Sequence, residues 1–195
     1  MNTSHKLCIK NPTRGAHCAA GFTLPELMVV IALVAMLMAM AVPAVGSGLA
    51  SLKLTSASNN LLFDIYLARS EAIKRNGRVV ICKSADAATC ATSGGWEQGA
   101  ILFQDANNNG MRDDHEQIIQ REPAFSRDLS ISGNNSVAEY ISYDSDGRSK
   151  LASGAFQAGT VTLCRHSGDP GDARQIVINA DGRPRVQKTT VQLCP

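Results

Sequence analysis

The sequence has 195 residues, with 19 lysines and arginines against 17 aspartates and glutamates and a formal net charge of +2. Three of the basic residues, Lys6, Lys10 and Arg14, lie within the first 21 residues, so the rest of the chain carries 16 basic and 17 acidic side chains. This balance does not indicate a protein that binds nucleic acid through its bulk charge, and the length leaves room for one long helix and one domain of ordinary size.

A long apolar segment follows the basic start. Residues 22–45 contain a single charged side chain, Glu26, and residues 27–42 contain no charged or hydrogen-bonding side chain. A helix of this length spans about 36 Å, compared with roughly 30 Å for the hydrocarbon core of a bilayer. Because backbone groups in lipid must be hydrogen-bonded within their own segment, we predict one membrane-spanning helix at residues 22–48.

Glu26 needs a partner, because a carboxylate inside an apolar helix costs roughly 2.5–3.5 kcal/mol. A secretory signal peptide, cleaved after the small residues of the segment Ala39–Ala44, gives this carboxylate no role, and neither does a plain uncleaved anchor. Cleavage between Gly21 and Phe22 creates a free amine four residues before Glu26. We therefore favour cleavage at this bond, with residues 1–21 as a leader peptide.

The basic leader and the residues Gly21, Phe22, Thr23, Leu24 and Glu26 resemble the class III signal of type IV prepilins and type II secretion pseudopilins. The resemblance implies that a prepilin peptidase cuts after Gly21 and methylates the amine of Phe22. It also implies that Glu26 pairs with the Phe22 amine, of its own or a neighbouring subunit, during assembly. The expected location is the bacterial inner membrane, as a single-pass protein with a periplasmic C-terminal domain, and then a fibre with other pilins or pseudopilins.

Residues 49–77 are predicted to continue the helix as an amphipathic half. Apolar residues recur at steps of three and four, which places them on one helix face. We predict that this face packs on a domain formed by residues 78–195, and that Gly77 ends the helix in a left-handed cap. The apolar face consists of Leu54, Ala57, Leu61, Ile65, Ala68 and Ala72.

From residue 78 onward, short runs with β-branched residues are separated by clusters of Gly, Asn, Asp and Ser. The segments 144–147 and 179–182 are predicted hairpin turns. The expected fold class is α+β, a long N-terminal spine helix packed on an antiparallel sheet, which is also what the pilin resemblance implies. The predicted strands are Val79–Lys83, Ala100–Gln104, Gln117–Arg121, Leu129–Ser132, Tyr140–Tyr143, Gly159–Cys164, Arg174–Asn179 and Arg183–Val186.

A second resemblance covers most of the chain after the leader. The run 69–72, a strand near Trp96, an Asp/Asn-rich loop and a late Gly-Arg-x-Arg motif resemble the GspH/FimT branch of the pilin superfamily. This resemblance implies a minor pilin or pseudopilin. Two functions stay open: a FimT-like subunit that captures double-stranded DNA for uptake, and a type II secretion pseudopilin that acts in protein export without binding DNA.

Four cysteines remain after removal of the leader, an even set in a domain sent across the membrane. Three pairings are possible, and we favour the local one, in which Cys82 bonds to Cys90 and Cys164 to Cys194. The first bond closes a short loop off the first strand, and the second ties the C-terminal end to the sheet. Their spacings do not fit a zinc site, so a structural role is expected.

Residues 105–116 match the pattern of a calcium-binding loop, with oxygen donors at the required positions and glycine at the sixth. Strand-like runs flank this loop where an EF-hand has helices. We therefore favour a polar hairpin loop and keep a weak calcium site as the alternative; no other cofactor is expected. The candidate ligands are Asp105, Asn107, Asn109, Asp113 and Glu116.

The late motif begins at Gly182, and its two arginines, Arg183 and Arg185, leave an extended segment on the same face. Pro184 lacks an N–H group, which predicts an edge strand or a loop. A guanidinium group suits phosphate, and the GspH/FimT resemblance implies that Gly-Arg-x-Arg binds DNA. The alternative is a solvated hairpin. Further basic residues expected near the motif are Lys188, Arg165 and Arg174.

The sequence offers no catalytic constellation. Outside the leader the histidines are His115 and His166, and no Gly-x-Ser-x-Gly, phosphate-binding glycine loop or His-Glu-x-x-His motif accompanies them. We predict that both are surface residues and that the chain is not an enzyme.

Overall fold

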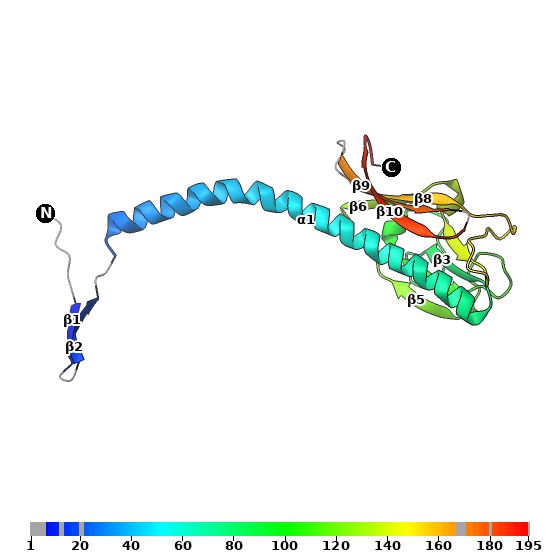
Figure 1. The fold of residues 1–195 in the computed structure, drawn as a ribbon, viewed down its shortest axis with the longest axis horizontal. Helices are drawn as coiled ribbons and strands as arrows, with labels where there is room; N and C mark the ends of the chain where they lie inside the picture. The colour runs from blue at the N-terminus through cyan, green and yellow to red at the C-terminus, as the bar shows by residue number, and fades with distance from the viewer. Residues whose placement is uncertain (1–6, 12–13, 20–21, 167–170, 180, 195) are drawn as a thin grey trace. The chain divides into compact units, whose positions relative to one another are not determined.

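The structure, a computed structural model, describes residues 7–11, 14–19, 22–166, 171–179 and 181–194, with the elements labelled in Figure 1. The chain forms two compact units, Met1–Leu49 and Ala50–Pro195. One helix, α1 (Leu24–Arg75), contributes residues to both units.

The N-terminal unit begins with an antiparallel hairpin of β1 (Leu7–Asn11) and β2 (Arg14–Ala19). Cys8 lies opposite Cys18, and the pairing register shifts between Ile9 and Asn11. These strands lie within the predicted leader, where the sequence patterns did not indicate strands. A hairpin of two strands is marginally stable by itself in water, so this segment provides little core of its own.

Helix α1 begins with a side-chain cap. Thr23 precedes the helix, and its carbonyl oxygen accepts a hydrogen bond from the Leu27 N–H at 3.1 Å. Glu26 reaches back, and its Oε2 accepts a hydrogen bond from the Thr23 N–H at 3.4 Å. Thr23 and Glu26 thus have the spacing of a capping box. Pro25 fits in this first turn because its missing N–H would have no partner within the helix.

The predicted membrane segment, residues 22–48, lies in this continuous helix from Leu24 onward. Its side chains at positions 40–47 lie outside the part of the chain that the structure describes. Large apolar side chains between Leu27 and Met38 are exposed. In the described residues, no helix combines the length and the apolar character needed to cross a membrane.

The C-terminal end of α1 is a Schellman motif. The Gly77 N–H donates to the Ala72 carbonyl oxygen at 3.2 Å, and the Asn76 N–H donates to that of Ile73 at 3.3 Å. Asn76 has the left-handed backbone conformation, with φ of +49°. The prediction that Gly77 takes this conformation is therefore wrong. Asparagine can fill the position because it tolerates the left-handed region better than most residues do.

The predicted apolar face of α1 is confirmed. Its six residues, from Leu54 to Ala72, are each at most 5% exposed. They belong to one core cluster that also contains residues of both sheets described below.

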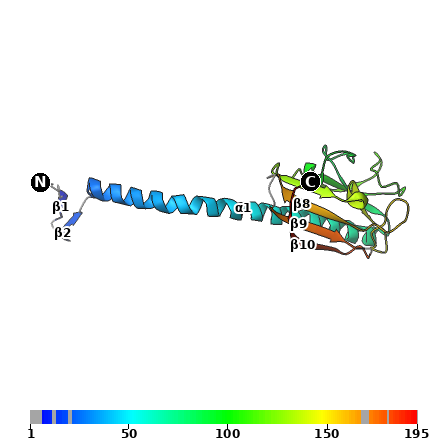
Figure 2. The ribbon, with the colours of Figure 1, turned by 90° about the horizontal axis from the view of Figure 1, so that it is seen from above.

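Residues beyond the helix form two four-stranded antiparallel sheets. The first has the order β5-β4-β3-β7 and the second the order β10-β9-β8-β6, and Figure 2 shows β8, β9 and β10 side by side. Short 3-10 turns occupy Trp96–Gln98 and Asn135–Val137. The strands are β3 (Val79–Lys83), β4 (Ala100–Gln104), β5 (Ile118–Glu122), β6 (Leu129–Gly133), β7 (Tyr140–Tyr143), β8 (Gly159–Arg165), β9 (Gly171–Ile178) and β10 (Pro184–Val191).

All eight predicted strands are present, and the α+β fold class is confirmed. The largest difference is at β10, which continues to Val191 instead of ending at Val186. This strand pairs with β9 along its whole length, from Pro184 opposite Ile178 to Val191 opposite Gly171. Its second half is polar because β10 lies at the edge of the sheet, so apolar alternation does not mark its end.

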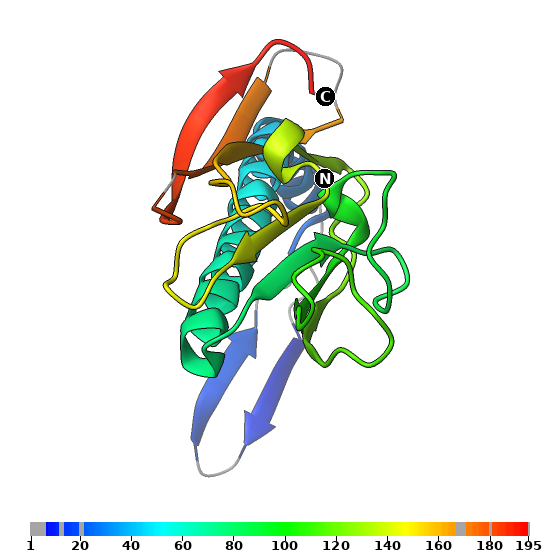
Figure 3. The same ribbon diagram turned by 90° about the vertical axis from the view of Figure 1, so that its right-hand side faces the viewer.

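Helix α1 packs against both sheets, and all three share a core. Figure 3 shows the helix with the orange and red strands on one side and the green strands on the other. Leu102 of the first sheet and Ile176 of the second pack in one cluster with Ile65 of the helix. The fully buried Trp96 donates a hydrogen bond from its indole Nε1 to the Val137 carbonyl oxygen at 3.1 Å.

Two disulfides join Cys82 to Cys90 and Cys164 to Cys194, the pairing favoured from the sequence. The first bond lies at the end of β3, and the second links β8 to the segment after β10. The second bond closes a sequence separation of 30 residues. By the chain-entropy relation, a loop of this length contributes about 3–4 kcal/mol.

A buried carboxyl group lies between α1 and the edge strand β5. Asp64 is 2% exposed, and its Oδ1 accepts a hydrogen bond from Gln120 Nε2 at 2.8 Å. Its Oδ2 is buried without a hydrogen-bond partner among the described residues. Burial, and after it the negative charge of Glu122, raises the pKa of Asp64 from 3.8 to about 7. Burial also raises the pKa of Glu122.

We expect the free energy of unfolding to decrease as the pH rises from about 4 to about 7, because folded Asp64 holds a proton that the unfolded chain has released. This contribution is complete below the unfolded pKa and is lost as the pH passes the folded pKa. Asp64→Asn should make this slope shallower, leaving the smaller contributions of the other buried carboxyl groups, and stabilise the protein at about pH 8 by about 2–4 kcal/mol. Urea unfolding at acidic and at alkaline pH measures this, and identical pH dependence of the variant and the wild type would contradict it.

Candidate functional site

The predicted cleavage and assembly residues lie at the start of α1. Gly21 lies outside the described residues, and Phe22 is 82% exposed. Glu26 contacts the Thr23 N–H in the uncleaved chain. The Phe22 nitrogen is here part of a peptide bond, so its pairing with Glu26 as a free amine stays a prediction.

The Gly-Arg-x-Arg motif begins in the tight turn between β9 and β10. The Gly182 N–H donates to the Asn179 carbonyl oxygen, and the Arg183 N–H donates to Asn179 Oδ1, both at 2.9 Å. Gly182 has φ of +72°, and a Cβ there would lie 2.8 Å from the Ser149 nitrogen and 2.9 Å from the Gly147 carbonyl oxygen. Only glycine suits both this backbone conformation and this close approach. The turn is therefore seated against residues 147–149.

The two arginines of the motif are exposed at the edge of the sheet. Arg183 comes directly before β10 and Arg185 is its second residue, so both side chains extend from the same face of the segment. Pro184 between them is buried, and its carbonyl oxygen accepts a hydrogen bond from the Tyr66 hydroxyl at 3.0 Å. The edge position predicted from Pro184 is confirmed. Tyr66 ties the motif to α1.

The other predicted basic residues do not join this pair. Lys188 lies three residues after Arg185, hence on the opposite face of β10, and pairs in register with Arg174. Arg174 is 6% exposed, and its Nη2 lies 3.4 Å from Thr55 Oγ1 on α1. Arg174 therefore does not extend the basic surface of the motif, because its side chain faces the helix. Arg165 is exposed at the end of β8 that is remote from the turn.

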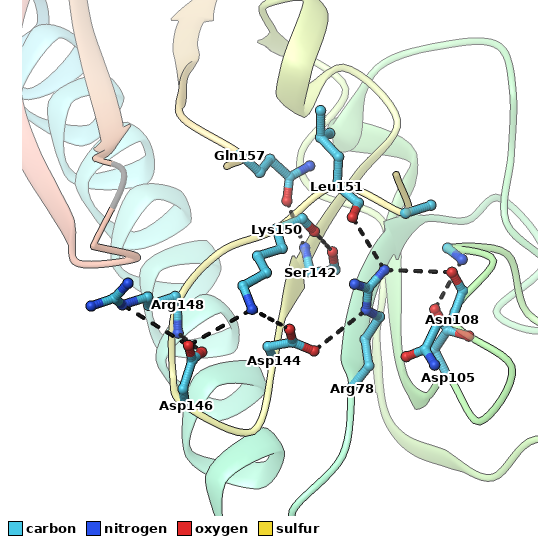
Figure 4. A network of polar contacts seen from close by, with 12 residues as sticks. Arg78, Asp105, Asn108, Ser142, Asp144, Asp146, Arg148, Lys150, Leu151 and Gln157 are labelled. Carbon is cyan, nitrogen blue, oxygen red and sulfur yellow. Dashed lines mark hydrogen bonds and ion pairs between the residues drawn. The ribbon is translucent and has the colours of Figure 1, made fainter. Parts of the chain in front are cut away.

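A charged network lies behind the turn and is drawn in Figure 4. Lys150 Nζ lies 2.6 Å from Asp144 Oδ2 and 3.8 Å from Asp146 Oδ2. Arg148 Nε lies 3.9 Å from the same oxygen of Asp146. The buried Arg78 directly precedes β3, and its Nε lies 3.8 Å from Asp144 Oδ1. The Arg148 backbone N–H, and after it the charges of Lys150 and Arg148, lowers the pKa of Asp146.

Two arginines near the motif were missed from the sequence. Gly147 has φ of +73°, and a Cβ there would lie 2.9 Å from Ile73 Cδ1 and 3.2 Å from Arg69 Nε. The turn that carries Gly147 and Arg148 therefore lies between α1 and Gly182. The only local signal was the Asp-Gly turn itself, and it does not show which side chains approach from the helix.

The loop predicted to bind calcium connects β4 to β5 and is closed by its own hydrogen bonds. Asp105 is buried, and its two oxygens accept hydrogen bonds from the Asn109 N–H at 3.1 Å and the Gly110 N–H at 2.9 Å. Burial raises the pKa of Asp105 despite these two hydrogen bonds. The adjoining Arg78 Nη1 donates to the Asn108 carbonyl oxygen at 3.5 Å.

The remaining candidate ligands also accept hydrogen bonds from the loop. Glu116 is buried and accepts from the Ala106 N–H at 2.8 Å and the Asp113 N–H at 3.0 Å. The side-chain nitrogens of Asn107 and Asn109 both donate to Asp113 Oδ2, at 2.7 Å and 3.1 Å. All five candidate ligands therefore lie in one loop, and hydrogen bonds within this polar hairpin occupy their side chains. Calcium binding stays a prediction.

The two histidines outside the predicted leader, His115 and His166, are exposed, as predicted for surface residues. His115 lies beside the loop, and its ring can offer a ligand atom within 4.8 Å of those of Asp113 and Glu116. Clusters of this kind are common at protein surfaces without a metal ion. The backbone N–H of His166 donates to the Asp128 carbonyl oxygen at 3.0 Å.

Comparison with protein-family profiles matches residues 57–182 to the family described as type II transport protein GspH. Residues 17–42 match the prokaryotic N-terminal methylation motif. A comparison with curated protein sequences found no match.

Among solved structures, the type IV minor pilin FimU of Pseudomonas aeruginosa has a TM-score of 0.53 and 19% identity, covering 74% of this chain and 97% of that one. A second crystal form of FimU has a TM-score of 0.51 and 19% identity, with coverage of 73% and 100%. At this identity the likeness shows the fold alone. The minor pseudopilin EpsH of the Vibrio cholerae type 2 secretion system is more distant. It has a TM-score of 0.47 and 10% identity, with coverage of 69% of this chain and 96% of that one.

We expect Glu116→Gln to destabilise the protein by about 1–3 kcal/mol in calcium-free buffer, because one of the two backbone N–H groups that donate to the buried Glu116 carboxylate loses its acceptor. Asp114→Asn is the matched control, since the Asp114 side chain is fully exposed. Thermal unfolding with a chelator and with added calcium measures both variants. A cost for Glu116→Gln that appears only when calcium is present would contradict a loop closed by its own hydrogen bonds.

Proposed function

This chain belongs to the GspH family and is a minor pilin or pseudopilin of a type IV pilus or type II secretion system, and we propose that it also binds DNA on the fibre. The proposal has two parts. The N-terminal segment anchors the chain and inserts it into the fibre, and the Gly-Arg-x-Arg turn contacts DNA phosphates.

The anchoring part rests on the exposed apolar side chains of α1 between Leu27 and Met38. Such a surface needs a cover, which lipid supplies before assembly and the helices of other subunits supply afterwards. In this account residues 22–48 hold the chain in the inner membrane, and the C-terminal domain lies in the periplasm. The disulfides Cys82–Cys90 and Cys164–Cys194 suit that oxidising compartment.

The assembly step depends on Glu26. Cleavage after Gly21 by a prepilin peptidase frees the Phe22 amine, which is then methylated and stays cationic. This cation neutralises the Glu26 carboxylate, which would otherwise be costly among apolar helices. In the uncleaved chain the same carboxylate caps the helix at Thr23, so capping and assembly are separable roles.

We expect Glu26→Ala to be processed and inserted into the membrane but poorly incorporated into fibres, because the Phe22 amine loses its counter-charge. Glu26→Gln is the sharper variant, since it keeps an oxygen that can cap Thr23 and removes only the charge. The measurement is the amount of each variant in sheared fibres relative to the membrane fraction. Normal incorporation of Glu26→Gln would leave capping as the role of Glu26 and refute the pairing.

The DNA-binding part rests on the geometry of the turn. Arg183 and Arg185 are exposed on one face, while Gly182 and Pro184 are buried and hold the turn in place. The planar guanidinium group matches phosphate oxygens, and a fixed turn loses little entropy on binding. Contacts of this kind read the backbone and not the base sequence.

We expect Arg183→Gln/Arg185→Gln to lower the affinity for duplex DNA and the slope of log affinity against log salt, the latter by about 1.8 if each arginine engages one phosphate. The matched control is Arg127→Gln/Arg165→Gln, which removes two exposed arginines remote from the turn. Fluorescence polarisation of the full chain in non-ionic detergent measures both. Equal binding by the two double variants would contradict a role for the motif.

The second candidate function is that of a minor pseudopilin that acts in protein export and binds no DNA. It is supported by the matched family description, type II transport protein. Absence of DNA binding by the wild type at low salt would favour this function.

A further inference from the structure

Three segments far apart in the sequence meet at the Gly-Arg-x-Arg turn. Gly182 lies against the Gly147 carbonyl oxygen, and Gly147 lies against Arg69 and Ile73 of α1. Tyr66, one helical turn before Arg69, donates its hydroxyl hydrogen to the Pro184 carbonyl oxygen. The helix, the 144–150 turn and the 182–185 turn are thus in contact, and at Gly182 the neighbouring backbone leaves no room for a side chain.

Each of these segments carries an arginine at this junction. Arg183 and Arg185 are exposed, Arg69 is half-buried, and the Arg148 side chain is 56% exposed. Within the described part of the chain, Arg69, Arg183 and Arg185 have no carboxylate within ion-pair distance, while Arg148 has Asp146 at 3.9 Å. Exposed pairs of this length contribute little, so Arg148 is available to another anion.

We propose that Arg69 and Arg148 extend the phosphate-binding surface of Arg183 and Arg185, so that all four arginines bind one stretch of DNA backbone. This inference rests on the proposed DNA binding and adds residues that the Gly-Arg-x-Arg motif does not contain. The surface is assembled only in the folded chain, because its members come from α1, from the turn after β7 and from the start of β10.

Asp146 opposes binding at this surface. Its Oδ2 lies 3.9 Å from Arg148 and 3.8 Å from Lys150, and its pKa is lowered, so it carries a negative charge where phosphate would approach. Figure 4 shows Asp146 between the two basic side chains. Removing this charge frees Arg148 and removes a repulsion. The structure thus predicts one variant that binds DNA more tightly.

The test is polarisation of a short fluorescent duplex by the full chain in non-ionic detergent, over a range of salt concentrations. Arg148→Gln and Arg69→Gln should each weaken binding by about 3- to 10-fold and lower the salt slope by about 0.9. Asp146→Asn should strengthen binding by about threefold at low salt. Arg121→Gln, on the edge strand β5 of the other sheet, is the matched control and should bind as the wild type does.

A conservative variant at Arg69 separates loss of binding from loss of the fold. Arg69→Lys keeps the charge and should bind better than Arg69→Gln, and a thermal midpoint for each variant shows whether the fold is kept. If Arg183→Gln/Arg185→Gln loses binding while Arg69→Gln, Arg148→Gln and Asp146→Asn bind as the wild type does, the extended surface is overturned and the proposed function stands. If the wild type binds no DNA, both are overturned.

Discussion

The apolar face of α1 from Leu54 to Ala72 packs against two sheets at once, and the rest of the C-terminal unit is arranged around this contact. Burying one large aliphatic side chain contributes roughly 1.5–3 kcal/mol, and three such residues, Leu54, Leu61 and Ile65, lie within this face. Neither sheet has another helix to cover it in the described part of the chain. The helix is therefore the common support of both sheets, and an edge strand of each sheet carries a contact to it.

Those two edges differ in chemistry. At β5 the contact is the buried Asp64, whose uncharged form fits between helix and strand. At β10 the contact is the hydrogen bond from Tyr66 to Pro184, which fixes the arginine turn. Gly182 then allows the turn to approach the backbone of residues 147–149, where a Cβ would collide. The helix whose first residues are proposed to serve assembly thus contacts, near the end of its own sequence, the turn that is the candidate DNA-binding site.

Much of this fold follows from local sequence. The three- and four-residue spacing predicts the buried face of α1, and the strands of the first sheet are found within one residue of their predicted ends. The features that were missed depend on tertiary contacts. Arg174 is polar, yet it faces α1, because strand alternation in β9 places it on the same side as Ile176.

Contacts between residues far apart in the sequence could not be predicted from local patterns. Arg69 and the Gly-Arg-x-Arg motif are more than a hundred positions apart, and only the packing of Gly147 between them joins the two. Asp64 is a polar residue of an amphipathic helix, and its burial depends on where β5 lies. The spacing of Thr23 and Glu26 is that of a capping box, but the same residues also belong to the leader motif, which suggests a different role for Glu26.

The proposed role in the fibre depends on cleavage after Gly21, which exposes the amine of Phe22. Intact mass and N-terminal fragment spectra of the wild-type protein from cells measure this cleavage, with Gly21→Val as the variant that should keep the whole leader. We expect a mature chain that begins at Phe22 and carries one added methyl group. A mature chain that still begins at Met1, or one cut after the apolar segment, would contradict it.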